Sequence, residues 1–482
     1  MIILSILFMP LAGAFVLGLY GHRPWAFAAN IGFSAATAVA TAVMTARVLA
    51  HGPFLALHDQ AFVDPFNVFL VDLTAFVTLT TAVFSRAYMH IESHMGRLTA
   101  GRLRLYHSMF QLFALTMLVA LLTNNIGILW VAMEGATLST TLLVSLYRTP
   151  ASLEAAWKYF ILCGVGIALA LFGTIMLYFS AHALIGGQAS LLWTDLDRVR
   201  TRLDPTIVGV AFAFLLLGYG TKVGLVPVHN WLPDAHAEGP TPISAVLSGL
   251  LLNVALYAVV RFQVLADGSL RDRWPNQLMM AFGLLSVLVA AFSLARQRDI
   301  KRLLSYSSIE HMGLATFAFG MGGPIAIFAA LLHMTVHSLT KSSLFFSGGH
   351  IAQKTGTQRI DQIQGLLGRN PAMGWAFMLG TLAILGTPPF GVFTSEFLIL
   401  TVAIHKEPWA LPFLAVGLGV AFAALFGRMQ AMVFGETRVP KAPAPTSLWP
   451  SFLHLALVLT LGLAIPPALS RWYTAAARLL GH

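Results

Sequence analysis

The sequence predicts an all-α polytopic membrane protein, and its composition, its repeated apolar runs and its few buried charges all point that way. Of 482 residues, 57% are hydrophobic and 10% are charged, and the mean hydropathy is +0.77. A soluble domain would carry roughly 25% charged residues. Apolar runs of about 20 residues, enough to cross a bilayer, recur along the whole chain. A single transmembrane domain over residues 1–482 is therefore expected.

These runs predict about fourteen spans. In order they are 2–20, 26–48, 66–86, 106–122, 126–147, 156–181, 206–227, 242–264, 276–294, 303–321, 324–347, 371–404 (interrupted), 409–434 and 450–470. The first is expected to be a retained helix rather than a cleaved signal peptide, since no Lys or Arg precedes it. The stretches between spans are too short for a nucleotide-binding domain, and neither a Walker A loop nor a GxGxxG motif is present.

The net charge of +10 is interpreted as a membrane-orientation signal rather than as a nucleic-acid surface. Lys and Arg are more frequent in loops that follow odd-numbered spans, as at Arg97, Arg102, Arg296 and Arg298. Because such loops stay in the cytoplasm, both termini are expected outside it, in a bacterial-type inner membrane. Cys163 is the only cysteine, which excludes an internal disulfide and a cysteine-held cluster. No cofactor is expected in this chain, so any redox chemistry would belong to a partner.

Lys222 lies near the end of the seventh span, where the helix is predicted to break. The segment KVGLVPVHNWLPDAHAEGPTP, from Lys222 to Pro242, contains Pro227 and Pro233 among its four prolines. Each proline removes a backbone donor that a helix needs. A broken helix beside an ionisable residue is typical of an ion pathway in a membrane. The alternative is a lysine whose side chain extends to the interface.

Glu134, in the fifth span, is the predicted partner of Lys222. No Lys or Arg lies within a helical turn of it, so its partner must come from another helix. A nearby carboxylate favours the protonated lysine, and its withdrawal favours proton release. The Glu134–Lys222 separation is therefore predicted to act as a switch. A purely structural, hydrogen-bonded glutamate is the alternative.

The eleventh span places His333, His337 and Lys341 at intervals of four residues. They share one helical face, one above another. Because histidine titrates near neutral pH, this column fits a proton relay. Zinc is the rival, since two histidines four residues apart can share a metal, but no third ligand lies on that face.

The twelfth span is interrupted in LGTPPFGVFTSEFLIL, where Pro388 and Pro389 precede Glu396. Two interrupted spans in corresponding positions are typical of transporters built from inverted repeats. The repeats are predicted over 106–264 and 276–434. Glu310 and His311, in SYSSIEHMG, are further candidates near a helix start.

The stretch KVGLVPVHNWLPDAHAEGPTPISAVLSG resembles the signature of a family of proton-conducting, antiporter-like membrane subunits. Its members belong to respiratory complex I, Mrp-type Na+/H+ antiporters and membrane-bound hydrogenases. SYSSIEHMG and LGTPPFGVFTSEF resemble two further motifs of that family. The resemblance implies fourteen transmembrane helices in two inverted five-helix repeats, with discontinuous helices seven and twelve.

The resemblance also implies a row of protonatable residues along the membrane midplane. By position these are Glu134 on helix five, Lys222 on helix seven, His311 and His337 in the centre, and Glu396 on helix twelve. Asn253 departs from the pattern, because many complex I relatives carry Lys or His there. Since Asn cannot take up a proton, a water path held by Asn253 would have to join Lys222 to His333 or His337. Otherwise the two halves are less tightly connected.

Asn253, Lys341 and the stretch MEGATLSTTLLVSLYRTPASLEAAWKYF are most similar to the hydrogenase-4 component F branch, found in formate hydrogenlyase-type [NiFe] hydrogenase complexes. Lys158, in that stretch, either joins the row or lies at the interface.

The expected function is ion translocation, with H+ the favoured ion, in a complex of this kind. The expected partners are other membrane subunits, the lipid bilayer, and [NiFe] hydrogenase and iron–sulfur subunits, with no nucleic acid. The rivals are a complex I subunit, a Mrp-type antiporter subunit, a proton-flux subunit of an inorganic-carbon uptake system, and a scaffold.

Overall fold

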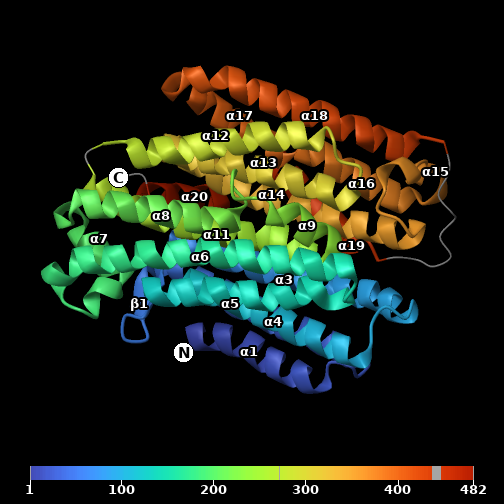
Figure 1. The fold of residues 1–482 in the computed structure, drawn as a ribbon, viewed down its shortest axis with the longest axis horizontal. Helices are drawn as coiled ribbons and strands as arrows, with labels where there is room; N and C mark the ends of the chain where they lie inside the picture. The colour runs from blue at the N-terminus through green and yellow to red at the C-terminus, as the bar shows by residue number, and fades with distance from the viewer. Residues whose placement is uncertain (1, 271, 437–446, 481–482) are drawn as a thin grey trace.

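Long helices that lie side by side make up almost all of the computed structural model, which describes residues 2–270, 272–436 and 447–480 (Figure 1). The first-half elements are α1 (Ile2–Tyr20), α2 (Ala26–His51), β1 (Phe54–Ala56), β2 (Ala61–Val63), α3 (Pro65–His94), α4 (Ala100–Leu122), α5 (Ile126–Val144), η1 (Ser145–Tyr147), α6 (Pro150–Ile185), η2 (Ala189–Leu191), α7 (Trp193–Val199), η3 (Arg200–Arg202), α8 (Pro205–Val223), α9 (Trp231–Glu238), α10 (Thr241–Val246), the π-helical η4 (Leu247–Leu251) and α11 (Leu252–Ser269).

The second half continues the same architecture without strands among its described residues. Its elements are α12 (Trp274–Leu294), α13 (Ile300–Met321), α14 (Pro324–Thr355), η5 (Ile360–Gln362), α15 (Leu366–Arg369), α16 (Pro371–Ile384), α17 (Gly391–Lys406), η6 (Pro408–Ala410), α18 (Leu411–Phe434), α19 (Trp449–Leu463) and α20 (Pro467–Leu480). The predicted fold class, an all-α polytopic membrane protein, is confirmed.

Ten helical segments of the described chain are long and apolar enough to cross a membrane. The other predicted spans correspond to α13, α14, the pair α16 and α17, and α19. Helices α13 and α14 carry the His, Lys and Glu residues discussed below, and α16 and α19 are short at 14 and 15 residues. The two inverted repeats remain a prediction.

Both predicted helix breaks are present. Helix α8 ends at Gly224, whose φ of +81° suits glycine, and Pro227 lies in the connection to α9, which itself contains Pro233. Neighbouring groups satisfy the freed backbone: the Trp231 indole donates to the Thr221 carbonyl at 2.8 Å, and Ser286 Oγ accepts from the Val226 amide at 2.9 Å. In the second break, Pro388 and Pro389 lie between α16 and α17.

Small residues bring helices close together where the buried charges lie. A Cβ added to Gly218 of α8 would lie 2.6 Å from the Gly166 carbonyl oxygen of α6. A Cβ on Gly313 of α13 would lie 2.7 Å from the Gly283 carbonyl oxygen of α12. Such small-residue contacts are typical of helix association in membranes.

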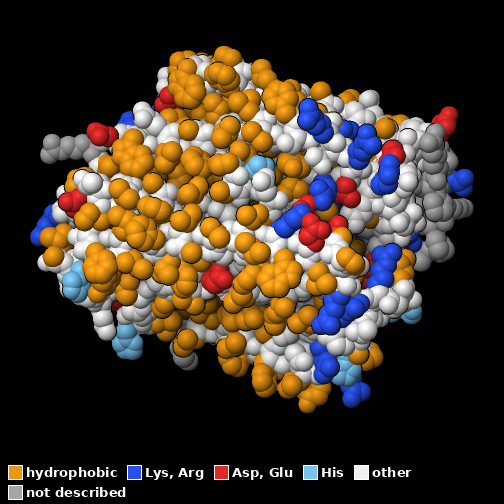
Figure 2. All heavy atoms as spheres, in the orientation of Figure 1, with side chains coloured by type: hydrophobic (Ala, Val, Ile, Leu, Met, Phe, Trp, Pro, Cys, Tyr) orange, Lys and Arg blue, Asp and Glu red, His pale blue; other side chains and the backbone are white. Residues whose placement is uncertain are grey.

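The surface divides as a membrane protein requires. In Figure 2, hydrophobic side chains cover the middle of the face, whereas Lys and Arg gather toward the ends of the helices at the right. Figure 1 shows α15 at that end. This distribution agrees with the positive loops seen in the sequence.

Candidate functional site: a buried row of protonatable side chains

Lys222 is fully buried in the last turn of α8 and is surrounded by hydroxyl groups. Its Nζ donates to Thr137 Oγ1 of α5 and, at 3.4 Å, to the Tyr159 hydroxyl of α6. The ammonium also lies 5.1 Å from the centroid of the Tyr159 ring, within cation–π range. The Tyr159 hydroxyl is 2.6 Å from Thr140 Oγ1, so α5, α6 and α8 hold the cation together.

Glu134 reaches Lys222 through Thr137. The Thr137 hydroxyl accepts from Lys222 Nζ, and its single proton is shared between the Met133 carbonyl at 3.1 Å and Glu134 Oε2 at 3.3 Å. Glu134 and Lys222 also interact electrostatically. The predicted partners are therefore close in space, and one hydroxyl joins them.

Asn253 is buried on α11, just after the π-helical turn. Its amide donates to Ser338 Oγ of α14 at 2.6 Å and to the Met334 carbonyl at 3.2 Å. Its Oδ1 has no hydrogen-bond partner within the described part of the chain. Asn253 thus connects α11 to α14, the helix that carries the histidine column.

The central histidines form a connected group between α13, α14 and α17. His311 Nδ1 is 3.1 Å from His333 Nε2, and His333 Nδ1 is 2.9 Å from Ser395 Oγ on α17. The ring centroids of His311 and His337 are 5.7 Å apart. Both ring nitrogens of His337 lack hydrogen-bond partners among the residues described here.

The row continues to Glu396 at the far side. Glu396 Oε1 lies 3.8 Å from His311 Nδ1. Glu310 interacts electrostatically with Glu396 and with Lys341, and the Lys341 Nζ donates to the Leu304 carbonyl of α13 at 3.0 Å. Glu310, His311 and Glu396 line a cavity of about 260 Å³ that α18 residues close.

Lys158 lies apart from this row. It occupies the surface of α6, where its Nζ is 2.7 Å from Glu154 and 3.1 Å from Asp234. The structure places Lys158 on the surface of α6, outside the row, and its location relative to the membrane interface stays a prediction. Within residues 2–270, 272–436 and 447–480, no group of three or more His, Cys, Asp or Glu is placed to hold a metal ion.

Several contacting residues were not predicted from the sequence. Thr137, Tyr159, Ser338 and Ser395 all bond directly to row members. A sequence signal exists for Thr137, because it lies three residues after Glu134 and shares its helical face. Ser395 and Tyr159 contact residues on other helices, which a single-helix pattern does not reveal.

Comparison with known proteins gives a consistent assignment. Residues 123–422 match the family described as "NADH:quinone oxidoreductase/Mrp antiporter, TM". The chain is 52% identical over 419 residues to the hydrogenase-4 component F homolog of Methylacidiphilum infernorum, covering 87% of this chain and 88% of that protein.

Two solved structures share the fold. A chain of the membrane-bound sulfane sulfur reductase, an archaeal respiratory membrane complex, superposes with a TM-score of 0.90 at 23% identity, covering 100% of this chain and 98% of that one. A chain of the Mrp complex from Dietzia sp. DQ12-45-1b gives 0.86 at 19% identity, covering 99% and 97%. The protein is a member of the NADH:quinone oxidoreductase/Mrp antiporter family of membrane subunits.

Proposed function

We propose that this chain is a proton-translocating membrane subunit of a hydrogenase-4 or formate hydrogenlyase-like complex. The carrying observation is two buried groups of ionisable side chains. Glu134 and Lys222 meet through Thr137, and His311 contacts both His333 and Glu396. Asn253 is bonded to α14, the helix that carries His333. Placing such groups within a membrane is costly, and they mark ion pathways. The 52% identity to a hydrogenase-4 component F homolog supports the hydrogenase assignment over the others.

Thr137 gives the row a way to respond to charge. A hydroxyl that donates to a carboxylate and accepts from an ammonium couples the two charges without direct contact. If redox chemistry in a partner draws Glu134 away, Lys222 loses electrostatic support and releases its proton toward Asn253 and the histidines. The return of Glu134 lets Lys222 take up another proton.

The position of Glu134 supports a partner subunit. It is half-buried, whereas Val131 and Leu138, on neighbouring turns of α5, are 59% and 50% exposed. A carboxylate beside lipid-facing residues is costly unless protein covers it. We expect another membrane subunit to pack against this face of α5 and, with [NiFe] hydrogenase and iron–sulfur subunits, to complete the complex. In the proposed orientation, in an inner membrane, the basic loops face the cytoplasm and both termini face the other side.

The experiment compares Lys222→Ala and Glu134→Ala with the wild type in membrane vesicles that contain the native complex. Proton movement is followed with a pH-sensitive dye while the partner enzyme turns over, and assembly is followed by the amount of complex purified. Both variants are expected to assemble and to lose coupled proton movement. Lys406→Ala is the control, because Lys406 donates to the Gly322 carbonyl outside the row. Unchanged pumping in both row variants would overturn the proposal.

The partners are identified by purifying the chain in mild detergent and determining what accompanies it by mass spectrometry. Co-purified [NiFe] hydrogenase and iron–sulfur subunits support the assignment. Co-purification of a quinone-reductase arm, or of a set of small antiporter subunits, would instead indicate that a different reaction drives ion movement through this chain.

A further inference from the structure

A groove of about 570 Å³ lies on the surface of α18, where that helix meets η5 and the loop between α12 and α13. Figure 1 shows α18 along one edge of the bundle, beside α12. None of the row residues is among the residues described as lining this groove. The groove is therefore a feature separate from the buried row.

The wall of the groove that α18 supplies is apolar and open. A Cβ added to Gly427 on this wall would have nothing within 4 Å. Phe422, on the same helix, is exposed, as expected where a membrane helix faces lipid. The small residues of the wall follow one another over just over two helical turns, and they are Ala423, Ala424, Gly427 and Ala431.

Two arginines lie at the end of the groove that is nearest the basic loop. Arg428 belongs to α18 and Arg298 to the loop between α12 and α13, and their charges repel each other. Arg428 Nη2 donates to the Ala295 carbonyl at 2.6 Å, but its Nε is buried and has no hydrogen-bond partner in the described part of the chain. A buried donor without a partner is costly, so an acceptor is expected beside it.

The carboxylate that lines the groove does not neutralise these arginines. Asp361 Oδ1 and Oδ2 accept from Arg359 Nε and Nη2 at 3.2 and 2.9 Å. Neither Arg298 nor Arg428 forms an ion pair with a carboxylate within residues 2–270, 272–436 and 447–480. The end of the groove therefore keeps a positive charge.

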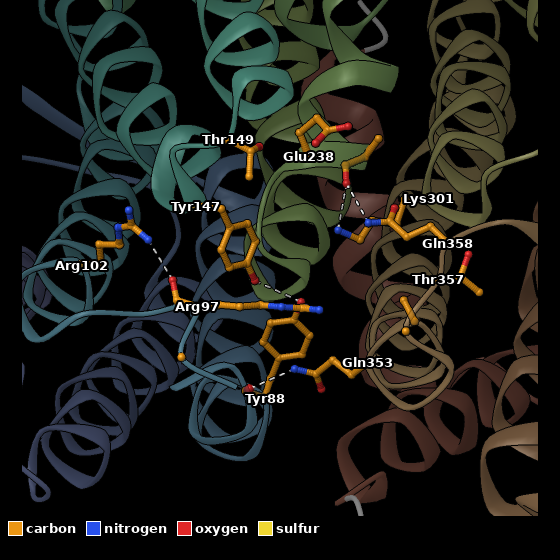
Figure 3. A pocket seen from close by; sticks show the side chains of 14 residues that line it. Tyr88, Arg97, Arg102, Tyr147, Thr149, Glu238, Lys301, Gln353, Thr357 and Gln358 are labelled. Atoms are coloured by element: carbon orange, nitrogen blue, oxygen red, sulfur yellow. Dashed lines mark hydrogen bonds between the residues drawn. The ribbon is translucent and has the colours of Figure 1, made fainter. Parts of the chain in front are cut away.

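The cavity in Figure 3, about 370 Å³ in volume, provides a contrast. There Arg97 lies 3.3 Å from the buried carboxylate of Glu92. Lys301 Nζ donates to the Ala237 and Gly239 carbonyls at 3.1 and 2.8 Å. Protein groups satisfy the cations of that cavity, whereas those of the α18 groove lack a counter-charge. The groove is thus the place where an anion is expected.

We propose that this groove binds an anionic phospholipid, with one acyl chain along the α18 wall and the phosphate beside Arg298 and Arg428. Arginine N–H groups donate strongly to phosphate oxygens, and Arg428 Nε has a proton to donate. Anionic lipids are found in the cytoplasmic leaflet, which the basic loops face in the proposed orientation. A free phosphate ion or an acidic peptide would leave the apolar wall uncovered, whereas a phospholipid matches both parts of the groove.

The first test maps the lipid on the native complex, purified in mild detergent. The probe is phosphatidylglycerol with a photoreactive diazirine on one acyl chain, and mass spectrometry of peptides locates the label after illumination. Label is expected on the α18 segment that contains Gly427, and several times less with phosphatidylcholine that carries the same chain. Equal labelling by the two lipids, or no label on α18, would overturn the proposal.

Excess unlabelled lipid and excess inorganic phosphate then distinguish two sources of the phosphate group. Unlabelled phosphatidylglycerol is expected to protect α18 from the probe, and inorganic phosphate at the same concentration is not. Equal protection by both would overturn a lipid as the occupant.

Arg298→Gln and Arg428→Gln test the contact with the phosphate. Each removes one charge, so labelling of α18 is expected to fall about fivefold, while the amount of purified complex stays constant. Arg102→Gln is the matched control, because Arg102 Nη1 also donates to a loop carbonyl, that of Arg97, at 2.9 Å. An equal loss in the control would mean that overall surface charge attracts the probe, which overturns the site.

Gly427→Phe tests the apolar wall with both arginines intact. The added ring would occupy the groove, and labelling is expected to fall about fivefold or more. Gly32→Phe on α2 is the matched control, because an added Cβ there also has nothing within 4 Å. If Gly427→Phe is labelled as fully as Gly32→Phe, the acyl chain does not lie along α18. Labelling is measured without ion movement, so this outcome and a failure of the proposed function are read separately.

Discussion

The hydroxyl of Thr137 joins Glu134 to Lys222, donating to the carboxylate at 3.3 Å and accepting from the ammonium. The two charges therefore belong to different helices, α5 and α8. The neutral hydroxyl of Thr137 lies between them and contacts both. On the proposed function, we expect a change at Glu134 to reach Lys222 through this hydroxyl.

Thr137→Val should disconnect this pair. The substitution removes the hydroxyl but keeps a β-branched side chain, so Lys222 keeps only the weaker Tyr159 contact at 3.4 Å. Losing a hydrogen bond to a charged group costs about 1.5–3 kcal/mol, which corresponds to a tenfold or greater change in proton occupancy. Dye-monitored proton movement in vesicles should fall by about tenfold or more, and Thr137→Ser should restore it.

Thr141→Val is the control for that variant. Thr141 lies one turn further along α5, and its hydroxyl bonds only the Thr137 carbonyl, at 2.8 Å, among the bonds described. If Thr137→Val pumps as well as Thr141→Val, the bridging hydroxyl has no role in coupling.

Ser395→Ala should loosen the central histidines. Ser395 Oγ lies 2.9 Å from His333 Nδ1 and is the contact that orients this ring from the broken helix α17. Without it, His333 can rotate away from His311, and proton movement should fall by about tenfold while the amount of assembled complex stays constant. The contact belongs to the second helix break, so the variant also tests whether that break serves the row.

The control is Ser343→Ala, which removes a buried hydroxyl from α14 that bonds the Ser451 carbonyl at 3.1 Å. Ser395→Thr keeps the hydroxyl and should preserve most of the flux. Equal losses in Ser395→Ala and Ser343→Ala would mean that general packing, rather than histidine orientation, accounts for the effect.

The positions of the helices, of the two breaks and of the main row residues could be predicted, because a charge or a proline inside an apolar span is energetically costly and is visible in the local sequence. A lysine in an apolar run, or prolines inside a span, mark a candidate site or a helix break within a few residues of sequence. Thr137 and Ser395 were not predicted, since a hydroxyl in a membrane helix usually bonds its own backbone. The second hydrogen-bond partner of each hydroxyl lies on another helix. Only the packing of the two helices determines whether the two groups meet.

Gly218→Ala should displace Lys222, which lies one helical turn further along α8. The new Cβ would meet the Gly166 carbonyl oxygen and the Ala170 amide at 2.6 Å, which forces α8 away from α6. Because Lys222 lies four residues later on the same face, it would move away from Tyr159. Overpacking of this kind costs about 1–3 kcal/mol, so both proton movement and the thermal unfolding midpoint should fall.

Gly164→Ala is the matched control on α6, because nothing lies within 4 Å of its added Cβ. It should leave flux and the unfolding midpoint unchanged. A Gly218→Ala variant that behaves like Gly164→Ala would show that α6 and α8 can separate without affecting the cation.

Arg261 and Asp64 form a buried ion pair that has no hydrogen bond to a row residue among the bonds described. Arg261 Nη2 donates to Asp64 Oδ2 at 2.7 Å, and the two side chains are 5% and 3% exposed. The rings of Phe62, Phe66, Trp193 and Tyr257 surround the guanidinium. Asp64 also caps α3, since its Oδ1 accepts from the Phe66 and Asn67 amides.

Arg261→Gln should destabilise the protein by about 3–5 kcal/mol, because it leaves a buried carboxylate without its partner. Adding Asp64→Asn should recover part of that loss, since the asparagine carbonyl still caps α3 while the buried charge disappears. The thermal unfolding midpoint of the purified complex measures both effects. A double variant no more stable than Arg261→Gln alone would mean that the aromatic contacts to the guanidinium, rather than the orphaned charge, account for the loss.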